Sequence, residues 1–135
     1  MPSNPLRRRP TSSQLADRAR AELHRALAVV DEAAATGNLA RLGLALSGDA
    51  LSEVQARFHA YQMAGIQVSP FREGLQIEVL EESTQERVWL RVRYRDRTGF
   101  LAARVAPATA GDPVELRVGL DATQTPWRIT TLIAS

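Results

Sequence analysis

An alternation of apolar and polar residues through the second half of the chain limits the fold more than any other feature. Its last segment, residues 127–133, places Trp127, Ile129, Thr131 and Ile133 on one face of an extended strand and the intervening residues on the other. A period of two is typical of a pleated sheet with one face against a core. The chain therefore needs a second layer that covers the apolar face of this sheet.

Earlier segments show the same alternation and are separated by turn-forming residues. The predicted strands lie at residues 66–68, 75–80, 88–95, 100–105 and 114–121. Residues 96–99 end in glycine, which indicates a tight turn, so we expect residues 100–105 to pair back on the strand before them. Pro70 limits the first strand to an edge or an end of the sheet. Residues 107–113 are expected to form a loop.

The first half of the chain carries helical periodicity instead. Apolar residues recur at spacings of three and four through residues 15–30, which draws one apolar stripe along a helix. Gly37 is a natural stop, because glycine adopts the left-handed conformation without steric cost. Asn38 is expected to cap the second helix, and Ser47-Gly48-Asp49 is expected to end that helix and to cap the third. Three helices are thus predicted, over residues 12–36, 39–46 and 49–65.

Helices grouped first and hairpin-linked strands grouped afterwards predict an α+β fold. We expect three N-terminal helices packed on a curved antiparallel sheet of five to six strands. A chain of 135 residues is long enough to bury a core, and residues 12–135 are predicted to form a single domain. Residues 1–11 contain Arg7, Arg8 and Arg9 and are expected to be a disordered basic leader. A weak contact of this tail with an anionic surface is the alternative.

Composition excludes several kinds of site. The chain has no cysteine, so a disulfide, a thiolate zinc site and a thiol nucleophile are all excluded. It has 17 arginines and no lysine, and without the three leader arginines 14 remain against 15 acidic residues, a net charge of −1. A near-neutral body makes nucleic acid an unexpected partner. No run of 18 apolar residues is present, and we expect a cytoplasmic location.

Arginine is concentrated on one face of the predicted sheet. The candidate binding residues are Trp89, Arg91, Arg93, Arg95 and Arg117. Arg104 and Arg128 lie on other predicted strands and would join this row in some registers, and Glu78 and Glu115 would neutralise part of it through cross-strand pairs. One interpretation is a charged outer face that prevents aggregation. The other is a binding surface for a partner, where arginine and tryptophan are enriched.

The predicted inner faces carry a second set of candidates. Tyr61, Tyr94 and Phe58 fall there, where tyrosine hydroxyls would give an apolar cavity a polar handle. The alternative is that these are core residues with partnered hydroxyl groups. His24 and His59 lie at the borders of apolar helical stripes and are expected at the surface, without the spacing of metal ligands. No metal site and no cofactor are therefore predicted.

The order of these elements resembles known folds. Three helices followed by a curved antiparallel sheet that ends in Trp127-Arg128-Ile129 are similar to the NTF2-like and cystatin-like cone folds. Residues 37–42 (GNLARL) and 46–51 (LSGDAL), followed by a helix that ends at Gly65, resemble the IMS-type branch, which occurs in plastid- and cyanobacterial-division proteins. The resemblance covers about residues 12–135. It implies a non-enzymatic module that docks partner proteins, often beside a membrane.

Two functions stay open at this point. The first is a non-catalytic protein-interaction or scaffolding module that acts through the outer sheet face or the cone mouth, on a protein partner or on a second copy in a homodimer. The second is a binder of a small apolar ligand, or a cyclase- or isomerase-like enzyme, that uses the cone cavity. NTF2-like enzymes carry Asp/His or Asp/Asp/Arg sets inside the cone, and no residue of this chain is matched to such a set.

Overall fold

Helices come first in the structure and strands follow, as the sequence predicts. The structure is a computed structural model that describes residues 12–101 and 111–134. Its elements are α1 (Ser12–Thr36), η2 (Leu39–Leu44), α2 (Gly48–Met63), β1 (Gln67–Ser69), β2 (Arg72–Val79), β3 (Arg87–Asp96), β4 (Gly99–Leu101), β5 (Asp112–Asp121) and β6 (Arg128–Ala134). The α1 helix has the bounds expected from its apolar stripe and from the glycine that follows it.

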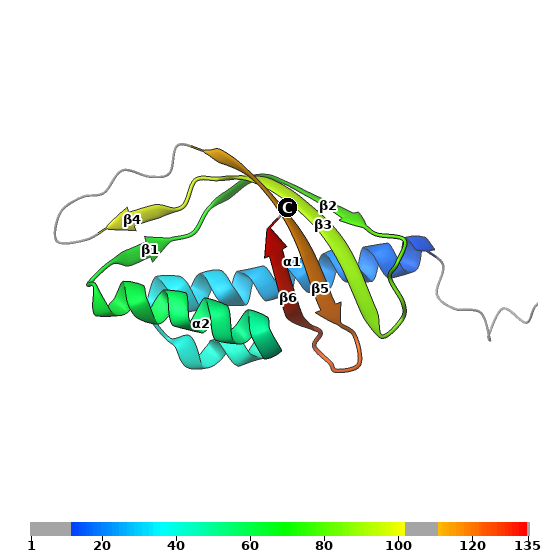
Figure 1. Cartoon of the computed structure of the whole chain (residues 1–135), viewed down its shortest axis with the longest axis horizontal. Coiled ribbons are helices and arrows are strands. Elements are labelled where there is room, and N and C mark those ends of the chain that lie inside the picture. Colours follow the sequence, from blue (N-terminus) through cyan, green and yellow to red (C-terminus); the bar gives the residue numbers. More distant parts are fainter. Residues whose placement is uncertain (1–11, 102–110, 135) are drawn as a thin grey trace, which may run out of the picture.

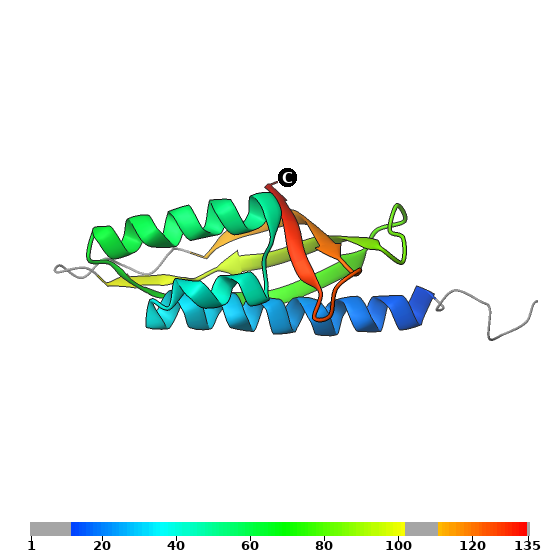
Figure 2. The same ribbon diagram turned by 90° about the horizontal axis from the view of Figure 1, so that it is seen from below.

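The strands form two antiparallel sheets. The larger has the order β2-β3-β5-β6, and β1 pairs with β4 in a separate two-stranded ribbon. The large sheet arches over the helices, which all lie on one side of it (Figure 1). Seen from below, α1 runs along most of the length of the molecule (Figure 2). The predicted α+β class with antiparallel strands is confirmed, whereas the NTF2-like cone stays a prediction.

The prediction of a hairpin at residues 96–99 is wrong. The β4 strand pairs with β1, with Phe100 opposite Val68, and not with β3. Both edges of β3 are already occupied, by β2 on one side and by β5 over ten residue pairs on the other. The carboxylate of Asp96 accepts a hydrogen bond from the Thr98 N–H at 3.0 Å, a local turn that leads the chain away from β3. The rest of the predicted strand lies outside the described residues.

Three other boundaries differ from expectation. Pro113 lies inside β5, opposite Arg95, so the predicted loop ends earlier than expected, and its residues before Gly111 lie outside the described part of the chain. The second helix is a 3-10 helix that ends at Leu44, not an α-helix to residue 46. Neither Asn38 nor Ser47 makes a side-chain capping bond. Both residues nevertheless occupy the N-cap positions of these helices.

The core lies between α1, the segment after it and the inner face of the large sheet. Its largest fully buried side chains are Leu23, Leu42, Leu46, Leu90, Leu120, Ile129, Val88 and Val118. Burying one such aliphatic side chain contributes roughly 1.5–3 kcal/mol before conformational entropy is subtracted. These residues come from both halves of the chain, so helices and sheet are stable only together.

A β-bulge changes the faces of the last strand. Trp127 and Ile129 are buried, as the alternation predicts. The register then shifts between Gly119 and Leu120, which leaves Thr130 as an extra residue in β6. Beyond it, Ile133 is 49% exposed and lies opposite Arg117 on the outer face. The inward positions predicted for Thr131 and Ile133 are therefore wrong.

The basic leader and Arg104 lie outside the described residues. None of the described helices is long and apolar enough to cross a membrane.

Candidate functional site

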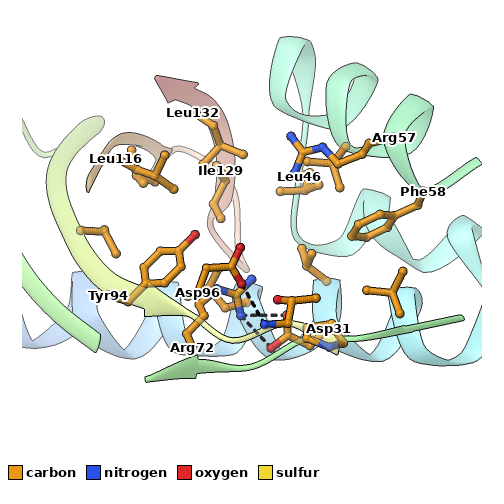
Figure 3. A pocket seen from close by; sticks show the side chains of 18 of the residues that line it. Asp31, Leu46, Arg57, Phe58, Arg72, Tyr94, Asp96, Leu116, Ile129 and Leu132 are labelled. Atoms are coloured by element: carbon orange, nitrogen blue, oxygen red, sulfur yellow. Dashed lines mark hydrogen bonds and ion pairs between the residues drawn. The ribbon is translucent and has the colours of Figure 1, made fainter. Parts of the chain in front are cut away.

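A pocket of about 190 Å³ lies between the two α-helices and the inner face of the large sheet. Its walls are mostly aliphatic and aromatic side chains, from α1 below, α2 on one side and β3, β5 and β6 on the other (Figure 3). Phe58, Tyr61 and Tyr94 all line it, so the inner-face candidates come together there. Leu116 and Leu132 close it on the strand side. Any role of these residues in binding stays a prediction.

The pocket exists because α2 is held to two different parts of the molecule. Its first half carries the buried residues Ala50 and Val54, which join the core. Its second half turns toward the small ribbon, where the Tyr61 ring packs on Phe100 of β4 with centroids 5.4 Å apart. The large sheet curves away over the same stretch (Figure 1). Space is left between α2 and the sheet that no described side chain fills.

Polar groups lie at one side of this pocket. The Nη1 of Arg72 on β2 donates to both carboxylate oxygens of Asp31 on α1, each at 2.8 Å. The Arg72 guanidinium also lies 5.8 Å from the centroid of the Tyr94 ring. Burial raises the pKa of Tyr94, so its hydroxyl group stays protonated at neutral pH and can donate a hydrogen bond. The pocket thus offers apolar walls, two tyrosine side chains, and the carboxylates of Asp31 and Asp96.

Both carboxylates in the described lining of this pocket already have partners. Asp31 is held by Arg72, Asp96 accepts the Thr98 N–H, and Arg57 lies 3.4 Å from Glu53 on its own helix. No histidine is among the described residues that line it. His24 and His59 are exposed on the helices. Within residues 12–101 and 111–134, no three acidic or histidine side chains are grouped as a metal site.

The arginine row lies on the outer face of the sheet, as expected. Most of its charge is neutralised, because Arg91 lies 3.0 Å from Glu78 and Arg93 lies 2.5 Å from Glu115. The hydrogen bond from Arg93 lowers the pKa of Glu115 below its usual value. Further along, Arg117 pairs with Glu82 at 2.8 Å. Arg95 donates to the carbonyl oxygen of Gly111 at 3.1 Å. The cross-strand pairs foreseen from the sequence are therefore present.

Trp89 fills a gap in this outer face. It lies directly over Gly119 of β5, where an added Cβ would stand 2.9 Å from the indole ring. The guanidinium groups of Arg117 and Arg87 lie 4.7 Å and 5.9 Å from the ring centroid. Packing on glycine and between two cations explains the half-buried indole without a partner. Arg128 does not join the row, since its Nε donates to the Gly43 carbonyl oxygen at 2.9 Å.

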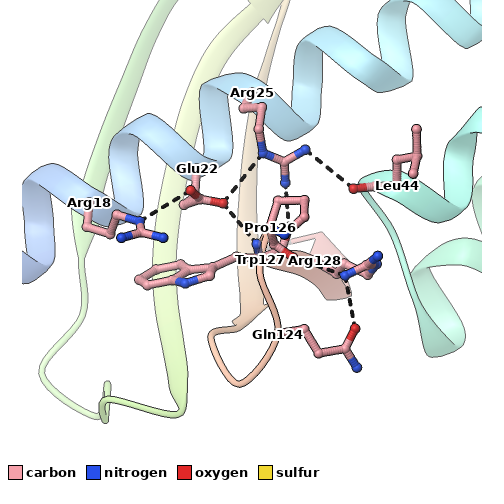
Figure 4. Close-up of polar contacts among 8 residues, drawn as sticks. All are labelled: Arg18, Glu22, Arg25, Leu44, Gln124, Pro126, Trp127 and Arg128. Carbon is pink, nitrogen blue, oxygen red and sulfur yellow. Dashed lines mark hydrogen bonds and ion pairs between the residues drawn. The ribbon is translucent and has the colours of Figure 1, made fainter.

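A polar cluster that sequence reasoning missed joins α1 to the β5–β6 turn (Figure 4). The Trp127 N–H donates to Glu22 Oε1 at 2.9 Å, and Arg25 Nη2 donates to the Trp127 carbonyl oxygen at 2.6 Å. Arg18 pairs with Glu22 at 3.2 Å and lies over the Trp127 ring at 5.3 Å. We call Glu22, Arg25 and Trp127 the helix–turn clamp. No local sequence signal joins these residues, because Glu22 and Trp127 are 105 residues apart.

Comparisons with known proteins bear on the fold alone. No family model and no curated protein matches the chain. A solved structure, the intermembrane space region of the chloroplast protein ARC6, is similar with a TM-score of 0.72 and 15% identity, over 89% of this chain and 97% of that one. A designed β-sheet protein is also 15% identical but has a TM-score of 0.37, too low to support an argument. The likeness to an intermembrane space region agrees with the IMS-type resemblance.

Proposed function

We propose that this chain is a non-catalytic protein-interaction module that takes up apolar side chains of a partner protein in the pocket between α2 and the sheet. The observation that carries the proposal is the apolar pocket of about 190 Å³, bordered by Tyr94 and the Asp31–Arg72 pair. The fold likeness to a region named for the intermembrane space is consistent with a module of this kind.

The size of the pocket favours a side chain over a free ligand. Clefts for small molecules typically have volumes of roughly 300–1,000 Å³. A pocket of about 190 Å³ is closer to the space that one or two apolar side chains occupy. Protein interfaces draw much of their binding energy from a few side chains anchored in such pockets. A partner segment that presents apolar side chains matches both the size and the lining.

The outer sheet face is the weaker candidate surface. A partner that bound Arg91 or Arg93 there would have to displace carboxylates that already pair with them. Exposed ion pairs contribute little to stability, roughly 0–1 kcal/mol. Exchanging one carboxylate partner of an arginine for another would therefore cost little, but it would also gain little binding free energy. The pocket, in contrast, gains apolar burial on binding without breaking a contact. Binding through the outer face and formation of a homodimer are the alternative proposals, and the test below distinguishes them from binding in the pocket.

One observation favours a small apolar ligand as the second candidate. The Tyr94 hydroxyl group points into the pocket beside the Arg72–Asp31 pair (Figure 3). A small apolar molecule with one acceptor atom would satisfy it. A cyclase- or isomerase-like activity is the third candidate: Asp31, Asp96 and Arg72 all line the pocket, but Asp31 is held by Arg72 and Asp96 accepts the Thr98 N–H.

The test combines peptide selection with two variants. Random 12-residue peptides displayed on phage are selected on the immobilised protein, and the peptides obtained are synthesised and their dissociation constants measured. Leu116→Phe fills the pocket from β5, and Arg91→Glu with Arg93→Glu and Arg95→Glu reverses the outer row. We expect the selected peptides to be rich in apolar residues. Their affinity should fall about tenfold or more for Leu116→Phe and should be unchanged for the triple variant.

If the triple variant lost affinity and Leu116→Phe kept it, the arginine row would be the binding surface. A selection that returns no specific peptide, together with saturable binding of acetophenone, an apolar molecule with one acceptor atom, that shifts the Tyr94 NMR signals, would favour the small-ligand alternative.

A further inference from the structure

The two edges of the large sheet differ in how they are protected. The β2 edge carries Arg72, Glu73 and Glu78, and a bulge with Gly74 at φ 68° interrupts it. Charges and bulges of this kind are the usual means by which proteins prevent other strands from pairing with an edge. Beyond Arg128 the β6 strand carries no charge and no proline, because residues 129–134 read ITTLIA, and its bulge at Thr130 lies before residues 131–134. Such an edge is a ready template for another strand.

The first residue of this edge is already paired. The Ser47 N–H donates to the Ile129 carbonyl oxygen at 2.9 Å, and the Ile129 N–H donates to the Ala45 carbonyl oxygen at 2.8 Å. Leu46 thus forms a short parallel bridge to Ile129. The chain then leaves the edge at Gly48, whose φ of 56° favours glycine, and begins α2. The chain's own segment shows that this edge accepts a strand.

The remainder of the edge borders the pocket. Residues 131–134 pair with β5 on one side, and no backbone hydrogen bond joins their other side to any part of the chain that the structure describes. Every second residue of a strand directs its N–H and C=O to the same side, so unpaired groups remain on this edge. Leu132 lines the pocket, and α2 faces it across the opening (Figure 3).

We propose that an extended, uncharged segment of a partner protein adds to the free edge of β6 at residues 131–134, where this edge borders the pocket, and directs alternate apolar side chains into the pocket. The inference rests on the proposed function and gives its mode of binding. Main-chain hydrogen bonds to β6 supply affinity, and the pocket selects the side chains at every second position. A peptide strand also covers the edge that the sequence leaves unprotected.

A second copy of this chain fits the same edge less well. It would offer only its own residues 131–134, and its own α2 lies on the same side as that edge (Figure 3). A free extended segment carries neither restriction. Self-association through β6 is therefore an outcome that would overturn the proposal.

The test uses the selected peptides with single N-methyl groups placed at each position in turn. An N-methyl group removes one main-chain donor and keeps every side chain. Strand addition predicts that methylation weakens binding by about tenfold at every second residue and has little effect at the residues between them, since each lost hydrogen bond leaves a buried acceptor on β6 unpaired. Hydrogen exchange measured by NMR should slow at backbone amides within residues 131–134 when the peptide is bound.

The outcomes separate the two proposals. A flat N-methylation profile with unprotected β6 amides would overturn strand addition, while a loss of affinity in Leu116→Phe would still support the pocket. Unchanged affinity in Leu116→Phe would instead remove the proposed function. Amides of residues 131–134 that are already protected in the free protein, with a dimer in sedimentation equilibrium, would assign the edge to a second copy.

Discussion

The helix layer meets the sheet in two different ways at its two ends. At the helix–turn clamp, charged side chains of α1 bond directly to the main chain of Trp127, and Glu22 is only 13% exposed (Figure 4). At the pocket, the second half of α2 stands apart from the sheet and presents the half-buried rings of Phe58 and Tyr61 and the exposed Arg57 (Figure 3). One end is fixed by directional bonds, and the other is left open.

The difference teaches which end is suited to binding. Hydrogen bonds to charged groups have narrow geometry, so the clamp holds α1 at one distance from β6. Apolar contacts have no preferred direction, so the open end can exchange them for those of a guest. The clamp therefore supports the fold, and the pocket is free to bind. Each prediction below compares a change at one place with a matched change at another.

The largest effect is expected in the buried core between the sheet and the helices. Leu90 on β3 is fully buried against the helix layer. Leu90→Asp would place a carboxylate in this core without a partner, and a buried unpaired charge costs several kcal/mol, comparable to the whole stability of a small domain. We expect loss of the cooperative unfolding transition in circular dichroism, whereas Arg93→Asp on the exposed face should retain it. A folded Leu90→Asp protein would contradict this account of the core.

The next effect separates the clamp from an exposed ion pair. Glu22→Ala removes the acceptor of the Trp127 N–H, which is left unpaired, and the carboxylate beside Arg25, which keeps only its hydrogen bonds to carbonyl oxygens. A hydrogen bond to a charged group contributes about 1.5–3 kcal/mol, so we expect a loss of about 2–3 kcal/mol in urea unfolding. The control is Glu53→Ala, which breaks an exposed pair on α2 and should cost less than about 0.5 kcal/mol.

Binding at the open end should survive the same change. If Glu22→Ala left the free energy of unfolding unchanged, the clamp would not be what fixes α1 on the sheet. If it also weakened peptide binding, the two ends would not be independent.

The sequence predicted most of the elements for a physical reason. Local signals determine them: the apolar stripe and Gly37 predicted the span of α1, and alternation over residues 88–95 predicted β3, which runs from Arg87 to Asp96. Pairing depends on residues far apart in the chain, and there the prediction failed. The β4 strand was assigned to the nearest strand in sequence, but β5 already occupies that edge of β3.

The candidate sites show the same division. Phe58, Tyr61 and Tyr94 were found because periodicity indicates which face turns inward. The clamp could not be found this way, since Glu22 and Trp127 are 105 residues apart and neither carries a local signal of the other. The bulge at Thr130 likewise arises from the β5–β6 register, and it reverses the faces of the residues after it.

A smaller effect compares two positions of the same strand. Leu116 lines the open pocket, whereas Leu120 is fully buried in the core near the clamp. Adding volume to a packed core typically costs about 1–3 kcal/mol, so Leu120→Phe should destabilise the protein by that amount. Leu116→Phe has space to enter and should change the free energy of unfolding by less than about 0.5 kcal/mol. Urea unfolding measures both, and equal losses would mean that the pocket does not exist in solution.

The smallest effect is expected on the outer face, where the ion pairs are exposed. The hydrogen bond from Arg93 holds the pKa of Glu115 below its usual value of 4.5. Because the folded-state pKa is the lower one, this pair contributes stability that is fully present above about pH 4.5 and is lost as the pH falls through the folded-state value. In Glu115→Gln, the melting temperature should therefore fall slightly less steeply as the pH drops below 4.5. Glu81→Gln in the exposed turn serves as the control. Solvent screens this pair, unlike the clamp carboxylate, so its effect should remain well below that of Glu22→Ala at neutral pH. A larger effect at Glu115 than at Glu22 would reverse the comparison, because the sheet's outer face would then hold the fold more strongly than the helix–turn clamp.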